Sequence, residues 1–154
     1  MRESGIKVIA KNRQASFNYM LGDRYEAGLV LTGTEIKSIR NNKVDLKRSF
    51  ARPEDGEMWV YELYISPYEQ GNRENHEPER KRKLLLHRKE IAKIERELTD
   101  RGVTIVPTKL YLKDGRAKIE VAVARGKKNY DKRQALAKKD AQRTIERSLK
   151  ERNR

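Results

Sequence analysis

The chain has 154 residues, with 37 Lys and Arg, 23 Asp and Glu, and a formal net charge of +14. This length can bury one modest core, so we expect a single domain with an appendage. The absence of Cys excludes disulfide and thiolate chemistry. No run of 18 apolar residues and no secretory-signal pattern is present, which favours a cytoplasmic protein with no membrane partner. The two histidines, His76 and His87, lack ligand-like spacing, so we expect neither a metal nor another cofactor.

The positive charge is concentrated at the C-terminus. Residues 125–154 hold twelve Lys and Arg against four Asp and Glu, which is +8 of the total, whereas residues 1–124 are only mildly basic. The apolar positions of this tail are few and mostly small, and four of them fall four residues apart on one thin helical stripe: Ala137, Ala141, Ile145 and Leu149. We therefore expect a basic arm that docks poorly on the body, is disordered or helical, and becomes ordered on RNA or DNA.

In the body, the first element to stand out is a strand followed by a short helix. Alternation over residues 25–32 places Ala27, Leu29 and Leu31 on one face, as a half-buried strand requires. After Gly33, the spacing of Ile36 and Ile39 predicts a helix over residues 34–40 with a Thr cap, ending at Asn41-Asn42.

Two hairpins follow, each with an Asp-Gly turn. Residues 46–52 and 58–65 flank Asp55-Gly56, and the alternation predicts that Trp59, Tyr61, Leu63 and Ile65 share one face.

The second hairpin joins residues 103–113 to 116–124 through Asp114-Gly115, with Lys118 facing away from the core. Between the hairpins, Ile91, Ile94 and Leu98 mark a helix that ends near Gly102.

Short strands with two helices in about 120 residues favour a closed or partly open barrel over a sandwich. The predicted fold is mainly β, an oligonucleotide-binding (OB)-like Greek-key barrel. The alternation does not determine the strand order.

Two features of the body suit nucleic acid, and each has a plainer alternative. The run Arg80-Lys81-Arg82-Lys83 before Leu84-Leu85-Leu86 would place cations on the barrel rim, or it is a solvated turn. Five tyrosines are candidates for stacking on bases, or are core residues: Tyr19, Tyr25, Tyr64, Tyr68 and Tyr111.

Catalytic patterns are missing from the sequence. Among the carboxylates considered for catalysis, only Glu26 stands out, near a strand centre, and a structural ion pair, with Arg24 as the one obvious partner, is the plainer interpretation. We find neither a Ser-His-Asp arrangement with local support nor a Gly-rich phosphate loop, so we do not expect an enzyme. Charge and strands alone indicate only a small RNA-binding barrel with a basic arm. A ribosomal or other basic structural RNA-binding protein would also fit this description.

Several motifs in order along the chain closely resemble the bacterial SsrA-binding protein (small protein B) family. They are Glu26-Ala27-Gly28, Gly33 to Arg40, Asn75-His76, Arg80 to His87 and Gly126 to Arg133. The resemblance spans nearly the whole chain and implies a non-enzymatic, six-stranded Greek-key barrel, OB-like, with short flanking helices. The family binds the tRNA-like domain of transfer-messenger RNA and carries that RNA to stalled ribosomes for trans-translation. The resemblance implies no small-molecule substrate, and we expect a monomer.

The resemblance also implies an RNA-binding face. It carries over residue by residue to Asn12, Arg13, Glu26, Leu85 and Lys118. To these we add rim cations on the grounds of charge: Lys37, Arg80, Arg82 and Lys83.

In the tail, the resemblance implies contacts with the decoding centre of the small ribosomal subunit and with the empty mRNA channel. The matching residues are Gly126, Lys127, Lys128, Asp131, Lys132 and Arg133. Tyr130 stands where many members have His, so stacking on a base is retained but a role for imidazole protonation is put in doubt.

Overall fold

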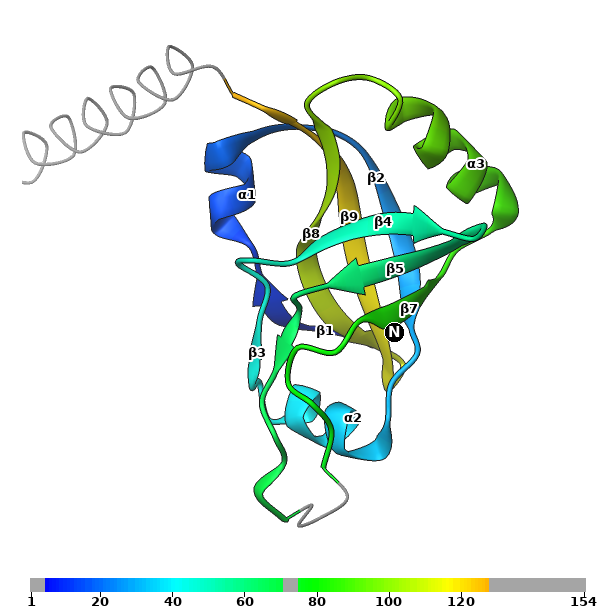
Figure 1. The fold of residues 1–154 in the computed structure, drawn as a ribbon. Helices are drawn as coiled ribbons and strands as arrows, with labels where there is room; N and C mark the ends of the chain where they lie inside the picture. Colours follow the sequence, from blue (N-terminus) through cyan, green and yellow to red (C-terminus); the bar gives the residue numbers. More distant parts are fainter. Residues whose placement is uncertain (1–4, 71–74, 128–154) are drawn as a thin grey trace, which may run out of the picture.

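A computed structural model describes residues 5–70 and 75–127. Within them, short helices alternate with mostly short strands (Figure 1). The elements are β1 (Ile6–Lys11), α1 (Arg13–Asn18), β2 (Tyr19–Leu29), α2 (Gly33–Arg40), β3 (Val44–Asp45), β4 (Phe50–Glu54), β5 (Glu57–Tyr61), β6 (Tyr64–Ile65), β7 (Arg82–Leu85), α3 (Arg88–Glu97), β8 (Val103–Lys113) and β9 (Arg116–Gly126). The expectation of a mainly β protein with short helices is confirmed. Strand β1 and helix α1 were not predicted from the sequence.

Six strands form a closed ring of antiparallel pairings. The order is β8-β4-β5-β7-β2-β9, and β9 returns to β8, while β1 pairs with β8 beside the ring. A separate pair joins β3 to β6. In Figure 1, α3 lies at one end of the ring and α2 at the other. The ring therefore has an inner face that forms the core and an outer face open to other molecules.

The core is built from the inward side chains of the long strands. Ala27 of β2 and Ile119 and Val121 of β9 are fully buried, as the alternation predicts. Ile94 of α3 is fully buried and Ile91 nearly so, which confirms the core face of that helix. The helix ends at Glu97, before Gly102 is reached.

Both predicted Asp-Gly hairpins are present. Asp55 and Gly56 have φ values of 51° and 78°, and Asp114 and Gly115 have 51° and 80°. Two successive left-handed residues match the right-handed twist of the flanking strands, and Asp and Gly tolerate this conformation well. The turns thereby fix the β4–β5 and β8–β9 registers.

The prediction that Trp59, Tyr61, Leu63 and Ile65 share one face is wrong. Leu63 and Ile65 are fully buried, whereas Trp59 and Tyr61 face outward and Met58 provides the core side of β5. The strand ends at Tyr61, and the next residue, Glu62, takes a left-handed φ of 55°, which breaks the alternation.

Helix α2 begins one residue earlier than predicted, and its N-cap is Thr32. The Glu35 carboxylate accepts a hydrogen bond from the Thr32 amide at 2.9 Å, so it caps the helix from within the first turn. The Glu35 side chain is fully buried and also accepts from the guanidinium groups of Arg80 and Arg82. This buried ionic cluster attaches α2 to the start of β7.

Arg82 extends the cluster to the chain on both sides of β6. Its guanidinium donates to the carbonyl oxygens of Leu63, at 2.5 Å, and Pro78, at 3.1 Å. His76 adds a second attachment, since its Nε2 lies 2.8 Å from the Ile65 carbonyl and its Nδ1 2.9 Å from the Thr34 hydroxyl. A carbonyl only accepts, so Nε2 carries the hydrogen.

We expect Glu35→Gln to destabilise the protein by on the order of 3–5 kcal/mol, because Arg82 would remain buried without a counter-charge. Gln retains an oxygen that can accept from Thr32, so the helix cap is preserved. Urea denaturation gives the comparison. Asp100→Asn, which removes an exposed ion pair with Arg125, is the matched control and should change the free energy of unfolding by less than about 1 kcal/mol.

The Glu35→Gln variant should also differ from wild type in how its stability depends on pH. Burial raises the pKa of Glu35, but hydrogen bonds from Arg80, Thr32 and Arg82 outweigh it, so the pKa lies below its ordinary value of 4.5. The stability that this carboxylate contributes is fully present above the pKa that Glu35 has in the unfolded chain. It is lost as the pH falls through the lower pKa that Glu35 has in the folded protein. Wild type should therefore lose more stability than Glu35→Gln on acidification below about pH 4.5. Equal losses would contradict this role.

Candidate nucleic-acid interface

Strand pairing brings together three residues that are distant in sequence. On the outer face of the ring, Leu85 of β7 lies opposite Gly28 of β2, and Gly28 lies opposite Lys118 of β9. Neighbouring strands are about 4.8 Å apart, so Leu85 and Lys118 flank Gly28 at close range. Glu26 precedes Gly28 by two residues and shares its face. The structure thus gathers Glu26, Leu85 and Lys118, which the resemblance assigned to one RNA-binding face.

Gly28 allows Leu85 to lie close over β2. A Cβ atom at Gly28 would stand 3.4 Å from both Cβ and Cδ1 of Leu85, at the limit of a comfortable contact. Leu85 itself is 55 % exposed, which is unusual for a strand leucine, while its neighbour Leu84 is buried. The outer face therefore presents an apolar side chain beside Lys118.

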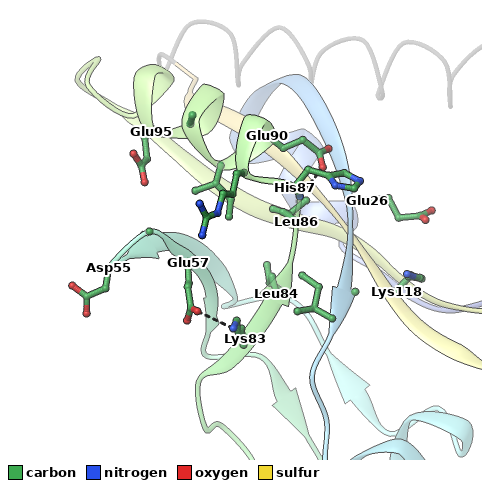
Figure 2. Close-up of a pocket in the computed structure, with 16 residues that line it drawn as sticks. Glu26, Asp55, Glu57, Lys83, Leu84, Leu86, His87, Glu90, Glu95 and Lys118 are labelled. Carbon is green, nitrogen blue, oxygen red and sulfur yellow. Dashed lines mark hydrogen bonds and ion pairs between the residues drawn. The ribbon is translucent and has the colours of Figure 1, made fainter.

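These residues border an open hollow of about 920 Å³ between β7, α3 and the β4–β5 turn (Figure 2). Lys83 and Lys118 are among its lining residues, and Lys83 pairs with Glu57 at 2.9 Å. Glu26 and Lys118 lie on one side of the hollow in Figure 2, and Asp55 and Glu57 lie on the other. One side of the hollow thus carries the gathered residues, and the other is acidic.

Glu26 is partly exposed and held by β8. Its carboxylate accepts a hydrogen bond from the Tyr111 hydroxyl and lies 3.5 Å from the Lys113 ammonium, while its side chain is 42 % exposed. Arg24 pairs instead with Glu120, at 3.2 Å, so Glu26 does form an ion pair, but its partner is Lys113 and not Arg24. The Tyr111 hydrogen bond, together with the charge of Lys113, lowers the pKa of Glu26 against the opposing effect of burial. Glu26 is therefore an ionised acceptor at neutral pH.

Asn12 and Arg13 border a second hollow, of about 340 Å³. Asn12 is the N-cap of α1: its Oδ1 accepts from the Ala15 amide at 3.3 Å, and its Nδ2 donates to the Pro107 and Leu46 carbonyls at 3.0 and 3.3 Å. Both hydrogens of the Asn12 side-chain amide are thus donated to groups within the protein. Asn12 attaches α1 to β8 and so positions Arg13, which is exposed.

The two hollows lie next to each other on one continuous face. Glu26 of β2 is opposite Glu120 of β9, Glu120 is opposite Lys109 of β8, and Lys109 is opposite Lys11 of β1. Apart from the acidic side of the first hollow, the part of this face around Glu26 and Glu120 carries six cations: Lys11, Arg13, Arg24, Lys109, Lys113 and Lys118. A polyanion would meet a predominantly positive surface here.

The structure places the other rim cations elsewhere. Arg82 is fully buried against Glu35, so its assignment to the RNA-binding face is wrong. We expected the cations of residues 80–83 to face outward together. Successive side chains of a strand point to opposite faces, however, and Arg82 falls on the inner face. Arg80 is half-buried and also binds Glu35. Lys37 is exposed on α2, 5.3 Å from the centre of the Tyr68 ring, away from the gathered residues.

The first residues of the predicted tail belong to the ring. Gly126 is the last residue of β9 and lies opposite Tyr19, and the Lys127 amide donates to the Asn18 carbonyl at 3.2 Å. The remaining tail residues lie outside the described residues: Lys128, Tyr130, Asp131, Lys132 and Arg133.

Two residues that hold Glu26, Tyr111 and Lys113, were not predicted from the sequence as part of the site. Tyr111 was considered only as a core residue or a stacking platform, and at 4 % exposure its ring is not a platform. Its hydroxyl nevertheless reaches the surface carboxylate. The one signal that could have indicated this contact is that Tyr111 lies opposite Lys118 in the second hairpin. That signal can be read only when the β8–β9 register is known.

Within residues 5–70 and 75–127, no group of three or more His, Asp or Glu is arranged to hold a metal ion. No helix in this part of the chain is long and apolar enough to cross a membrane.

Comparison with known proteins identifies the family. The model of the SmpB protein family matches residues 9–151. An SsrA-binding protein of Desulfitobacterium hafniense (strain DSM 10664 / DCB-2) is 60% identical over 151 residues, covering 98% of this chain and 97% of the relative. This chain belongs to the SmpB family.

Further comparisons agree on the family. An SsrA-binding protein of Geobacillus thermodenitrificans is 58% identical over 146 residues, covering 95% of this chain and 94% of the relative. A chain of a solved structure described as "tmRNA-SmpB: a journey to the center of the bacterial ribosome" matches with a TM-score of 0.68 and 45% identity, over 84% of this chain and 94% of that one. The family resemblance seen in the sequence is confirmed.

If Leu85 packs against RNA, Leu85→Ala should weaken binding to transfer-messenger RNA by about tenfold. The substitution removes three carbons, worth about 0.8 kcal/mol each when fully buried, and the RNA would newly bury only the exposed half of the side chain. The free energy of unfolding should change by less than about 1 kcal/mol, since the side chain is half exposed. Met20→Ala, at a residue that is 58% exposed near the far end of β2, is the control. Equal effects of the two substitutions on binding would contradict the assignment.

Proposed function

We propose that this protein binds the tRNA-like domain of transfer-messenger RNA (SsrA) and delivers that RNA to stalled ribosomes for trans-translation in the bacterial cytoplasm. Membership of the SmpB family and the names of the relatives support the RNA partner and the non-enzymatic role. The observation that carries the site is the gathering of Glu26, Leu85 and Lys118 on one exposed face through the β7–β2–β9 register.

The proposed contacts divide by chemistry. Lys118, Lys83 and Arg13 attract the phosphate backbone, which supplies affinity but little sequence information. The Glu26 carboxylate accepts hydrogen bonds from a guanine edge or a 2′-hydroxyl, and unpaired loop bases offer such edges. Leu85 packs on an exposed base or sugar. Asn12 contributes by holding α1, and with it Arg13, in place.

We further infer that the six-stranded ring is the OB-like Greek-key barrel implied by the resemblance. A closed barrel has no free edge between these strands, and its outer face is held in a fixed register. Such a face can present residues 26, 85 and 118, and α1 attached to β8 can present residue 13, so that binding a folded RNA need not order these side chains first.

The tail is proposed to act on the ribosome. Its positive charge suits the decoding centre and the empty mRNA channel of the small subunit, where residues 126–133 would bind and the rest would form a helix. Tyr130 offers a ring for stacking on a base, as His would. Because β9 continues through Gly126, we place the functional boundary after Lys127, slightly later than the boundary at residue 124 indicated by charge.

The RNA proposal predicts selectivity that survives salt. Wild type should prefer the tRNA-like domain to an unrelated structured RNA of equal length, and the preference should persist at high salt, where phosphate contacts weaken. Glu26→Ala should reduce this preference while leaving binding to the unrelated RNA nearly unchanged. Lys93→Ala, at an exposed cation of α3, is the control. Equal, salt-sensitive binding to both RNAs would instead favour a generic basic RNA-binding protein of the ribosomal kind.

The tail proposal predicts a separation of functions. A chain ending at Lys127 retains β9 and should bind the tRNA-like domain within about twofold of wild type, because the proposed contacts lie in the body. It should fail to support peptide tagging on stalled ribosomes in a reconstituted translation reaction. Tagging by the truncated chain would refute the assignment of ribosome engagement to the tail.

A further inference from the structure

The Glu26 carboxylate is oriented by a buried tyrosine that lies beneath the proposed RNA-binding face. Tyr111 of β8 is 4 % exposed, yet its hydroxyl donates a hydrogen bond to one oxygen of Glu26. The other oxygen lies 3.5 Å from the ammonium of Lys113, which is too long to fix its direction. One oxygen of Glu26 is therefore tied to the protein.

The tyrosine ring is itself immobilised. It lies between Lys118 of β9 and Val8 of β1 in the strand register, and the ammonium of Lys109 lies 5.4 Å from its centre. These neighbours come from three strands. The hydroxyl is therefore delivered to a defined position on the face, next to Lys118.

We propose that Tyr111 is a positioning residue for RNA recognition, whose hydroxyl holds Glu26 with one carboxylate oxygen directed toward the RNA. The inference rests on the proposed function and adds to it a residue that does not touch the RNA. A free glutamate side chain on a strand samples several rotamers, and fixing it before binding removes an entropy cost that binding would otherwise meet.

The protonation states suit this role. Burial, followed by the hydrogen bond to ionised Glu26, raises the pKa of Tyr111, so the hydroxyl remains a donor at every physiological pH. The charged groups facing Glu26 are Lys113 from β8 and Lys118 from β9, with Glu120 opposite it across the β2–β9 pair. Of all its neighbours, Tyr111 contributes most to lowering the pKa of Glu26.

The test is a double-mutant cycle in the full-length chain, with the tRNA-like domain of transfer-messenger RNA as the probe. Tyr111→Phe retains the ring and removes only the hydroxyl. It should weaken binding about three- to tenfold in the wild-type background, the usual effect of losing one hydrogen bond to a charged group. In the Glu26→Ala background the same substitution should change affinity by less than about twofold, because nothing remains to be positioned.

Tyr25→Phe is the matched control. Tyr25 neighbours Glu26 in sequence but points to the opposite side of β2, and its buried hydroxyl has no hydrogen-bond partner among the described residues. Its removal should leave RNA affinity unchanged in both backgrounds. Thermal unfolding of every variant separates a binding effect from a folding effect.

A second readout is independent of RNA. The pKa of Glu26 in the free protein, followed through its side-chain carboxyl carbon by NMR, should rise in Tyr111→Phe and remain unchanged in Tyr25→Phe. The outcomes distinguish the two proposals. If Glu26→Ala does not weaken binding, the proposed site is wrong. If Glu26→Ala weakens binding but Tyr111→Phe is neutral, acts equally in both backgrounds, or leaves the Glu26 pKa unchanged, the positioning role is overturned.

Discussion

The register of β2 between β7 and β9 determines which side chains this protein presents to its surroundings. Gly28 lies opposite Leu85 on one side and Lys118 on the other. Side chains alternate along a strand, so a slip by one residue would turn Lys118 into the core and Ile119 out of it. The full burial of Ala27 and Ile119 makes such a slip costly, and the same burial thereby fixes the outer face.

The charged residues of the body serve two separate purposes. In the run from residue 80 to 83, Arg80 and Arg82 hold Glu35 and attach α2 to β7, whereas Lys83 remains at the border of the large hollow. On the neighbouring strand β2, Glu26 keeps 42 % of its side chain exposed. A buried ion pair contributes to a defined local arrangement, and an exposed charge contributes to binding, so net charge alone describes neither role.

The local pattern of the sequence was sufficient for the hairpins, for the core faces of β9 and α3, and for the outward direction of Lys118. These features depend on residues close to one another in the chain. Arg82 was misassigned because the local sequence around a strand cation does not show whether a carboxylate is available to pair with it inside the core. The partner here, Glu35, is distant in sequence. The contact of Tyr111 with Glu26 was missed for the same reason, since it joins two strands that are far apart in the chain. The faces of Trp59 and Leu63 differed from expectation because the left-handed Glu62 interrupts the alternation.

The central claim is that the outer face at β7, β2 and β9 is where the RNA binds, and hydrogen exchange of the full-length protein with and without the tRNA-like domain tests it most directly. The account predicts that added protection concentrates in β7, in the β2 segment around Glu26 and Gly28, and in the β9 segment around Lys118. The exposed part of α2 around Lys37 should be nearly unchanged. Protection centred on α2, with no change around Glu26 and Leu85, would contradict the account.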